Sequence, residues 1–438
     1  MIRVRFSAVP AGYLYIRGAR IALANALFAL RHRGTFLLRL DDRDSGHCRP
    51  SFVDALIHDL HWLGLEWQET LRQSERLPRY EAAAERLKAA GRLYPCFETQ
   101  EELRYKQEQR RRQGKPTVYD RGMLNLTPEQ RAAAEANGKR PHWRFRLSDR
   151  TVSWEDLAAG PREAKLPSVS DPVVISSDGS LSSAFASVVD DIDTGITHVI
   201  EGEENAAQAG IEIDLFTALG AEIPRFAHIP TLTEDPGRRS GRRIDVLTVR
   251  SLRADGVEAV ALAACLAGDE AASVMSFTEL AATFELPRPD APHRFDTGRL
   301  LRLNRQVLGA ASFASVAERL PPGATEAFWL AIRGNIDLLN EARGWWDVVA
   351  GTIVPPVMSN ERAFLHIARD MLPDEPWDQE VLDRWLAQLA EATGRHGPAL
   401  LAPLRLALTG EETGPDLGLM LPLIGRARAL NRLAIAVA

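Results

Sequence analysis

The first 30 residues constrain the fold of this chain more than any other segment. Apolar residues alternate from Ile2 to Phe6, as in a short β-strand, and a turn containing proline and glycine follows. Helical periodicity begins near Gly18 and continues to Leu30. A strand, a tight turn and the N-terminus of a helix form a ready site for a phosphate group. The segment therefore predicts an α/β fold with a phosphate-binding turn.

The same alternation of strand and helix continues to about residue 90. Phe36–Leu40 is an apolar run of strand length, and an acidic turn follows it. Helices are predicted over about Phe52–Leu63 and Tyr80–Ala90. Strands that alternate with helices pair in parallel, and such sheets bind ligands at the carboxyl ends of their strands. We therefore expect a parallel sheet with a ligand site at that edge.

The pattern changes beyond residue 100. Residues 100–140 are highly charged and helical in pattern, and three apolar runs then predict strands of a mixed insertion: His142–Leu147, Thr151–Trp154 and Asp171–Ser176. Two further short apolar runs are predicted to re-enter the first sheet: Ser187–Asp191 and Thr197–Glu201. Gly237–Arg243 is a loop rich in glycine and arginine, and helical periodicity dominates from about Arg250 onward.

Composition narrows the class of protein. The chain has 438 residues, 45% of them hydrophobic and 26% charged, which excludes a largely disordered chain and predicts several domains. The net charge of −6 means that any nucleic-acid binding depends on local basic patches. Three cysteines without a CxxC pair fit a reducing compartment. Since the N-terminus reads as a strand and no apolar run could span a bilayer, we expect a soluble, cytoplasmic protein without a membrane partner.

Stretches along the whole chain match one enzyme family. They include F-L-L-R-L-D-D-R-D at Phe36–Asp44, L-H-W-L-G-L-E-W at Leu60–Trp67, S-V-V-D-D-I-D at Ser187–Asp193 and P-L-R-L-A-L-T-G at Pro403–Gly410. From Arg5 to about Leu433 the chain resembles the bacterial glutamyl-tRNA synthetases, which are class I aminoacyl-tRNA synthetases. Its altered site motifs make it resemble a divergent paralogue within that family.

The resemblance implies a fold class and a division into domains. The fold class is α/β, with a Rossmann-like catalytic domain that is split by an acceptor-stem insertion and followed by an all-helical domain of the anticodon-binding type. The catalytic domain is expected over residues 1–95 and 186–250, and the insertion over residues 96–185. A helical stem-contact region is expected over residues 251–320, and the anticodon-binding-like domain over residues 321–438.

The reaction that the resemblance implies has two steps. ATP and glutamate form glutamyl-adenylate, and the 3′ hydroxyl of tRNA then takes the glutamyl group. The expected ligands are ATP with Mg, glutamate or another amino acid, and tRNA, and a monomer is expected. Catalysis of this kind depends mostly on positioning and on neutralising the charge of the triphosphate.

The positions that contact ATP in the family differ in this chain. Tyr15 stands where the family has a histidine that hydrogen-bonds the phosphates, and Arg17 stands where it has a glycine against which adenine packs. A tyrosine can donate a hydrogen bond but carries no positive charge near neutral pH. Gly18 is kept, while Val9 lies in a segment that has lost two hydroxyl groups. The alternative is that Tyr15 and Arg17 are ordinary surface residues.

The amino-acid pocket implied by the resemblance is also altered. Arg5 is kept where the family grips the glutamate carboxylate, and Asp41 stands where it binds the α-amino group. Ser183 replaces a tyrosine, while Glu201 and Asn205 occupy the first and last positions of the family's R-G-E-D-H. Two like charges about 4 Å apart repel by about 4 kcal/mol at an effective dielectric constant near 20. Glu201 therefore disfavours glutamate unless Arg5 compensates; the alternative is an exposed acid beside a strand.

A second ATP-contacting motif of the family is a mobile basic loop. Arg242 aligns with its critical lysine and Arg243 follows, so the positive charge is kept. An arginine presents a planar fork and not a compact ammonium group, so the exchange is not neutral at a phosphate site. The alternative is a solvated charged loop.

Basic residues in the insertion and in the distal domain are candidates for tRNA binding. They are Arg104, Lys106, Arg110, Arg111, Arg112, Lys115 and Arg405. Such patches bind phosphate backbones, although a solvated helix face is the alternative. Some relatives carry a Cys-x-Cys pair in the insertion, but here Cys96 is followed by Phe97 and Glu98. We therefore predict no zinc or other metal site and a core position for Cys96.

Taken together, the altered ATP and glutamate positions predict that the family's ATP-dependent ligation of glutamate to tRNA is impaired or lost. Two alternatives stay open. One is a non-catalytic paralogue that binds tRNA or a protein. The other is a repurposed enzyme that acts on a different amino acid or on aminoacyl-tRNA.

Overall fold

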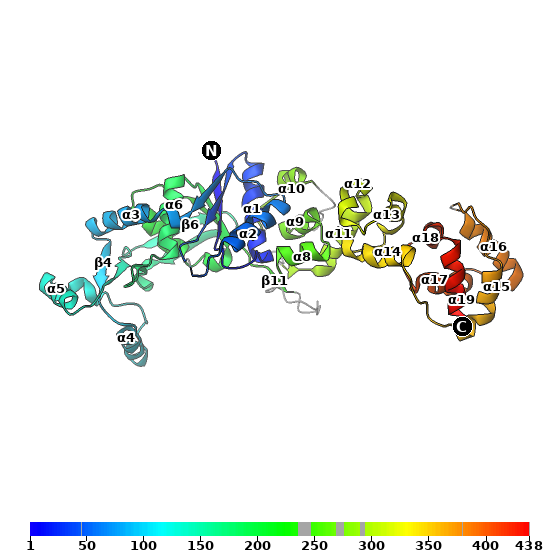
Figure 1. The fold of residues 1–438 in the computed structure, drawn as a ribbon. Helices are drawn as coiled ribbons and strands as arrows, with labels where there is room; N and C mark the ends of the chain where they lie inside the picture. Colours follow the sequence, from blue (N-terminus) through cyan, green and yellow to red (C-terminus); the bar gives the residue numbers. More distant parts are fainter. Residues whose placement is uncertain (45, 235–246, 269–275, 290–293, 379, 438) are drawn as a thin grey trace. The chain divides into compact units, whose positions relative to one another are not determined.

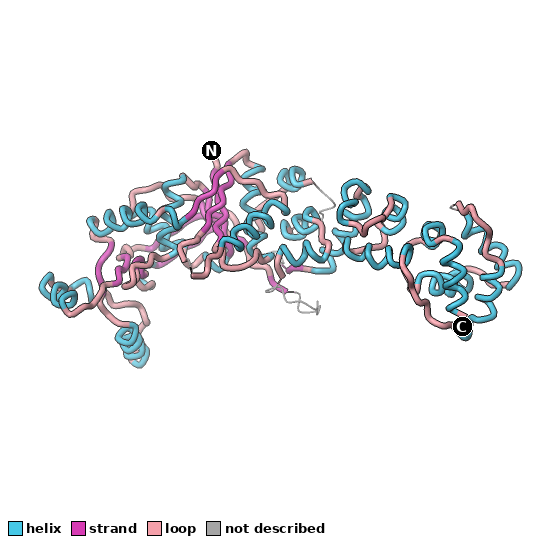
Figure 2. Tube along the Cα trace, in the orientation of Figure 1, coloured by secondary structure: helices cyan, strands magenta, loops and turns pink. Residues whose placement is uncertain are grey.

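The protein is described by a computed structural model that covers the whole chain except residues 45, 235–246, 269–275, 290–293, 379 and 438. The chain divides into two compact units (Figure 1). Unit 1 comprises residues 1–250 and 266–295, and unit 2 comprises residues 251–265 and 296–438. The strands belong to unit 1, and unit 2 is helical throughout its described part (Figure 2).

Unit 1 begins with the predicted parallel sheet. Its strands lie in the order β1-β2-β3, with bounds β1 Arg3–Ala8, β2 Thr35–Leu40 and β3 Glu69–Arg72. Both pairings are parallel, which confirms the expectation from the alternating pattern. Helices connect and follow these strands: α1 Ile16–Arg31, α2 Pro50–Trp62 and α3 Leu77–Ala89. Eleven residues of α1 are buried, because its small and aliphatic side chains fit closely against the sheet.

A second parallel pair places another carboxyl end beside β1. Its strands are β9 His198–Gly202 and β10 Arg225–Ile229. The Thr197 backbone N–H donates to the Arg3 carbonyl at 3.0 Å, so β9 begins next to β1. The strand predicted at Thr197–Glu201 is present and begins beside β1, but its ladder partner is β10, so the two strands form a separate pair and do not extend the β1-β2-β3 sheet. The carboxyl ends of β1 and β9 consequently lie at the same edge.

The strand expected at Ser187–Asp191 is wrong, because these residues belong to helix α6 (Ser183–Thr194). Phe185, Val188, Val189 and Ile192 recur at intervals of three and four residues, which is helical spacing. The Ser182 hydroxyl caps the helix by accepting from the Phe185 backbone N–H at 3.2 Å. The short V-V-D-D run resembles a strand only when the residues on either side are ignored.

The insertion contains a small antiparallel sheet and two protruding helices. The sheet has the order β4-β5-β8, and β6 and β7 form a hairpin; the bounds are β4 Leu93–Cys96, β5 His142–Phe145, β6 Thr151–Asp156, β7 Gly160–Lys165 and β8 Val173–Ile175. Helices α4 (Gln100–Arg112) and α5 (Pro128–Ala136) bury none of their residues. Unit 1 also contains α7 Ala209–Ala218, β11 Thr233–Glu234, α10 Phe277–Thr283 and β12 Arg294–Phe295.

Unit 2 is built on one continuous helical core. The core runs from Leu308 to Val437 and includes the fully buried side chains of Trp329 and Trp385. Trp345 and Trp346 pack against it. The helices are α11 Thr297–Ala310, α12 Phe313–Val316, α13 Glu326–Ile332, α14 Ala342–Ala350, α15 Arg362–Asp370, α16 Val381–Thr393, α17 Pro398–Thr409, α18 Leu417–Ile424 and α19 Arg426–Ala436. The boundary between the units passes through α8 (Val249–Asp255) and α9 (Ala259–Ala267). The four domain ranges given by the resemblance stay a prediction.

Candidate active site at the carboxyl ends of the parallel strands

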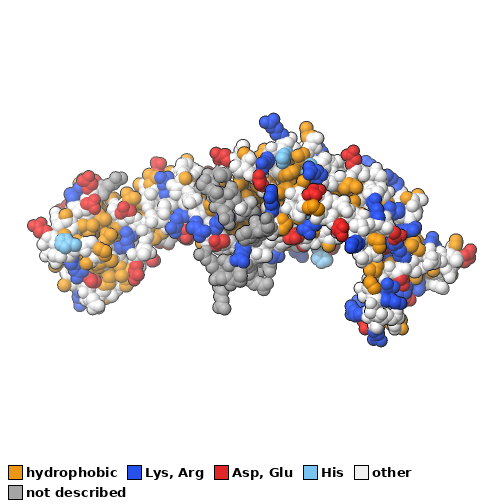
Figure 3. Space-filling model, turned by 180° about the vertical axis from the view of Figure 1, so that it is seen from behind, with side chains coloured by type: hydrophobic (Ala, Val, Ile, Leu, Met, Phe, Trp, Pro, Cys, Tyr) orange, Lys and Arg blue, Asp and Glu red, His pale blue; other side chains and the backbone are white. Residues whose placement is uncertain are grey.

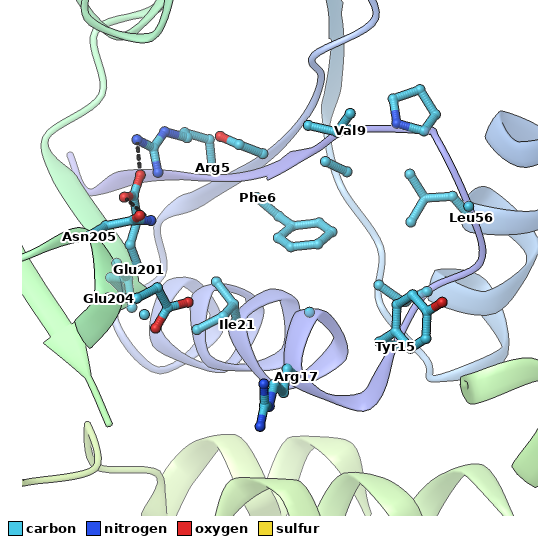
Figure 4. Close-up of a pocket in the computed structure, with 18 of the residues that line it drawn as sticks. Arg5, Phe6, Val9, Tyr15, Arg17, Ile21, Leu56, Glu201, Glu204 and Asn205 are labelled. Atoms are coloured by element: carbon cyan, nitrogen blue, oxygen red, sulfur yellow. Dashed lines mark hydrogen bonds and ion pairs between the residues drawn. The ribbon is translucent and has the colours of Figure 1, made fainter. Parts of the chain in front are cut away.

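A pocket of about 600 Å³ lies at the carboxyl ends of β1 and β9 and beside the start of α1 (Figure 4). Seven of the residues singled out from the sequence line it: Arg5, Val9, Tyr15, Arg17, Gly18, Glu201 and Asn205. The parallel strands bring Arg5 and Glu201 together although they are 196 positions apart. A cavity of this size suits a small organic ligand.

The Arg5 guanidinium is held by two carboxylates. Its Nε and one terminal nitrogen donate to the two oxygens of Asp191 at 3.0 and 3.1 Å, in a bidentate pair. The same terminal nitrogen donates to Glu201 Oε1 at 2.7 Å. The side chains of Arg5 and Asp191 are each 3% exposed, whereas Glu201 is 18% exposed. The group expected to grip a ligand carboxylate therefore binds carboxylates of its own chain.

The electrostatics of this cluster follow from burial and close charges. Burial lowers the pKa of Arg5, but Asp191 and Glu201 more than offset it, so the pKa is raised. Burial raises the pKa of Glu201, but Arg5 outweighs that effect and holds the pKa below its ordinary value. Glu212, on α7, has its pKa raised to about 8, first by burial and then by the charge of Glu201. The Arg5–Glu201 pair is thus ionised near neutral pH, and Glu212 tends to keep its proton.

A second arginine extends the network behind the pocket. Arg39 donates to Asp41 Oδ1 at 2.8 Å and to Asp191 Oδ1 at 3.1 Å. Asp41 is thereby engaged by a neighbour two residues away, and it does not line the pocket. Asp191 accepts from both arginines and so links Asp41 to Arg5.

Asp191 is a site residue that was not singled out from the sequence. The V-V-D-D motif was predicted to form a strand. Interpreted as a helix, the same motif places the carboxylates of Asp190 and Asp191 in the buried part of α6. Both carboxylates are buried: Asp190 accepts hydrogen bonds from Gln73, Arg76 and Tyr80. The available signal was the helical period of the apolar residues around the motif.

One wall of the pocket is acidic. Glu201 Oε2 accepts from Asn205 Nδ2 at 3.0 Å, and Glu204 Oε2 accepts from the Thr231 hydroxyl at 2.7 Å. A Cβ at Gly202 would lie 2.3 Å from the Glu204 carboxylate, so the glycine leaves room for that side chain to fold back. Glu204 and Gly202 were not singled out from the sequence, although both lie in the E-G-E-E-N segment.

The start of α1 is tied to a distant segment. The Ile16 N–H donates to the Leu247 carbonyl at 3.1 Å, and the Val249 N–H donates to the Leu14 carbonyl at 2.9 Å. Tyr15, 48% exposed, lies between these two hydrogen bonds. Figure 4 shows Arg17 on the side of α1 that faces away from Phe6. Arg17 therefore borders the pocket from its rim and does not fill its centre.

Besides Asp41, three residues predicted to contribute to the site are not among those that line the described pocket. Ser183 is exposed at the first position of α6, directly after the N-cap residue Ser182. Arg242 and Arg243 lie outside the described residues. The predicted roles of all these residues stay predictions.

The basic residues of the insertion lie mainly on α4. Arg104, Arg111, Arg112 and Lys115 are exposed, and Figure 3 shows lysine and arginine side chains gathered on this projection. Lys106 differs, because it pairs with the buried carboxylate of Glu98 at 2.5 Å. Arg110 donates to the Pro116 carbonyl at 2.7 Å. The four exposed cations are the ones best placed to meet a phosphate backbone.

The remaining predicted residues lie in the core of the insertion and in unit 2. Cys96 is fully buried, as predicted, and burial raises its pKa to about 11. Within the described part of the chain, no three His, Cys, Asp or Glu side chains are arranged to hold a metal ion. In unit 2, Arg405 donates to the Pro415 carbonyl at 2.7 Å and borders a separate, largely apolar pocket.

The fold and the site together define a class I aminoacyl-tRNA synthetase catalytic domain followed by a helical domain of the anticodon-binding type. Residues 1–280 match the family described as tRNA synthetases class I (E and Q), catalytic domain, and residues 358–437 match the anticodon binding domain. The chain belongs to this family of class I tRNA synthetases.

Curated relatives match the chain over nearly its full length. A protein named glutamate–tRNA ligase 2 from Granulibacter bethesdensis is 54% identical over 99% of this chain and 98% of its own. The glutamate–tRNA ligase 2 of Gluconacetobacter diazotrophicus is 49% identical over 99% of this chain and 100% of its own. The solved structure of the glutamate-tRNA synthetase from Elizabethkingia anophelis has a TM-score of 0.84 at 23% identity and covers 100% of this chain and 99% of its own. That likeness supports the fold.

None of the described helices is both long and apolar enough to cross a lipid bilayer.

Proposed function

We propose that this protein is a glutamyl-tRNA synthetase-like protein in which the ATP-dependent ligation of glutamate to tRNA is impaired or lost. The observation that carries the proposal is the engagement of Arg5 by Asp191 and Glu201. By resemblance, Arg5 is the residue that would grip the glutamate carboxylate. Here that guanidinium is already neutralised.

A glutamate ligand would meet an unfavourable charge in the pocket. Its side-chain carboxylate would have to displace Glu201 from Arg5 or lie next to Glu201. Two like charges about 4 Å apart cost about 4 kcal/mol at an effective dielectric constant near 20, which is close to a thousandfold in affinity. The family's pocket would thus keep its shape and lose its preference for an acidic amino acid.

The ATP side of the pocket supports the same proposal. The pocket volume is compatible with a nucleotide, and Gly18 still borders it. Tyr15 offers a hydroxyl in place of a cationic imidazole, and one lost donor typically costs about 2.7–4 kcal/mol of transition-state stabilisation. We propose that any ATP with Mg would bind along the start of α1, with weaker stabilisation of the phosphates than in the family.

The decisive experiment is glutamate-dependent ATP–pyrophosphate exchange in the presence of a glutamate-accepting tRNA. We expect no exchange above background from the unmodified protein. The Glu201→Gln variant frees Arg5 of one carboxylate and should bind glutamate more tightly. Glu203→Gln is the matched control, because Glu203 is an exposed neighbour that does not line the pocket. Robust exchange by the unmodified protein would contradict the proposal.

The repurposed-enzyme alternative is favoured over the purely non-catalytic one by a specific observation. The pocket keeps a volume of about 600 Å³ with a few polar groups in its lining, among them Arg5, Glu201 and Asn205, and pre-formed cavities of this kind are typical of ligand sites. Binding of tRNA through the exposed cations of α4 is compatible with either alternative.

A further inference from the structure

We infer that the pocket accepts an amino acid whose side chain ends in an amine, with Glu201 and Glu204 pairing that cation. The inference rests on the proposed loss of glutamate ligation and names the substrate class of the same site. It reverses the charge of the expected ligand.

The charges at the Arg5 end of the pocket do not balance. The guanidinium groups of Arg5 and Arg39 pair with three carboxylates, those of Asp41, Asp191 and Glu201. Glu204 adds a further carboxylate to the pocket lining and pairs with neither arginine. Glu212 lies close enough for the charge of Glu201 to raise its pKa. Arg17 also borders the pocket, but at its rim and on the side of α1 that faces away from Phe6 (Figure 4). A ligand cation would compensate the excess negative charge at this end.

Glu201 has capacity left for a ligand. A carboxylate offers about four lone-pair positions, and the hydrogen bonds of Glu201 to Arg5 and Asn205 use one on each oxygen. Arg5 and Asn205 fix the position of the carboxylate while its side chain remains 18% exposed. A carboxylate that is fixed in advance binds a cation at a lower ordering cost.

Glu204 provides a second carboxylate on the same wall. The Thr231 hydroxyl holds one of its oxygens at 2.7 Å. Ser7 also lines this pocket, and its hydroxyl is buried without a hydrogen-bond partner among the described residues. An incoming polar ligand can satisfy that hydroxyl, which is a reason for a ligand that is independent of the carboxylates.

Direct binding separates this inference from the proposed function. The full-length protein is titrated by calorimetry with L-ornithine, L-lysine, L-norleucine and L-glutamate, and the shift of the melting temperature is followed in parallel. Norleucine has the carbon chain of lysine without the amine. We expect ornithine or lysine to bind at least about tenfold more tightly than norleucine or glutamate. Neither norleucine nor glutamate has the side-chain ammonium group that would pair with Glu201 and Glu204.

Variants locate the preference. Glu201→Gln and Glu204→Gln should each reduce the advantage of the amine over norleucine, whereas Glu203→Gln should leave it unchanged. Glu204 is exposed, so its variant tests the idea even if the Glu201 variant is poorly folded. Equal binding of norleucine and lysine, or no binding of either amine, overturns this inference. The proposed function is overturned by a different result, robust glutamate-dependent ATP–pyrophosphate exchange by the unmodified protein.

Discussion

At the scale of single residues, the site depends on buried carboxylates that share two arginines. Asp191 is the central member, because it accepts hydrogen bonds from both Arg5 and Arg39. Breaking a buried pair by removing one partner costs more than forming the pair gains, since it leaves an uncompensated charge. Loss of one carboxylate from this network should therefore lower the free energy of unfolding far more than the same substitution at the surface.

Asp191→Asn should lower the free energy of unfolding by about 3–5 kcal/mol, because two buried guanidinium groups lose their shared carboxylate. Asp193→Asn is the matched control on the same helix. Its partner is Arg76, its side chain is 32% exposed, and the expected loss is below about 1 kcal/mol. Urea denaturation of both variants measures the difference, and similar losses would contradict the central role of Asp191.

The raised pKa of Glu212 should make the free energy of unfolding depend on pH. Its pKa rises from 4.5 to about 8 in the folded chain, so folding takes up a proton between these values. The stabilisation is therefore complete below about pH 4.5 and is lost as the pH rises through about 8. Each pKa unit corresponds to about 1.4 kcal/mol.

The Glu212→Gln variant should lose this part of the pH dependence and be more stable than the unmodified protein at pH 9. Denaturation midpoints at pH 6, 7, 8 and 9 measure the effect, with Glu203→Gln as the control. A variant curve parallel to that of the unmodified protein would show that Glu212 is ionised in the fold.

At the scale of elements, the sequence predicted those whose periodicity extends over several turns or a full strand. Strands β1 and β2, helix α1 and the parallel pairing follow from alternation and helical spacing. Helix α6 was missed because two adjacent valines favour a strand locally, while packing of its apolar face decides the outcome. The Arg5–Glu201 contact could be suspected from the sequence, because Glu201 stands where the family's R-G-E-D-H motif has an arginine. Its bidentate partner Asp191 could not, because the contact depends on how α6 lies against β1.

The N-cap of α6 offers a paired test at this scale. Ser182→Ala removes the hydrogen bond to the Phe185 N–H and should cost about 1 kcal/mol of stability. Ser183→Ala, one position further on, removes an exposed hydroxyl that does not cap the helix, so its effect should stay within about 0.5 kcal/mol. Thermal or urea unfolding of the two variants distinguishes them, and equal losses would exclude the capping role.

At the scale of the whole molecule, the net charge of −6 coexists with a cluster of exposed cations on one projecting element. Local charge governs binding to a polyanion when the rest of the chain is too distant or too screened to oppose it. The net charge left nucleic-acid binding to local basic patches, and the exposed position of α4 makes its cations accessible for that role.

Replacing Arg104, Arg111, Arg112 and Lys115 together by alanine should weaken tRNA binding and reduce its dependence on salt. Each lost phosphate contact lowers the slope of log affinity against log salt by about 0.7–0.9. Fluorescence anisotropy at several salt concentrations measures the slope, and Lys165→Ala, at an exposed lysine on β7, is the control. An unchanged slope would mean that α4 does not contact tRNA.

The Arg5–Glu201 pair also sets up a competition between a tethered and a free carboxylate. Because Glu201 is attached to the same chain and held 2.7 Å from Arg5, its effective concentration there far exceeds that of any dissolved metabolite. A free anion gains access to Arg5 only in the fraction of time that Glu201 is away. The apparent affinity of every carboxylate ligand is reduced by that same fraction, whatever the rest of its structure.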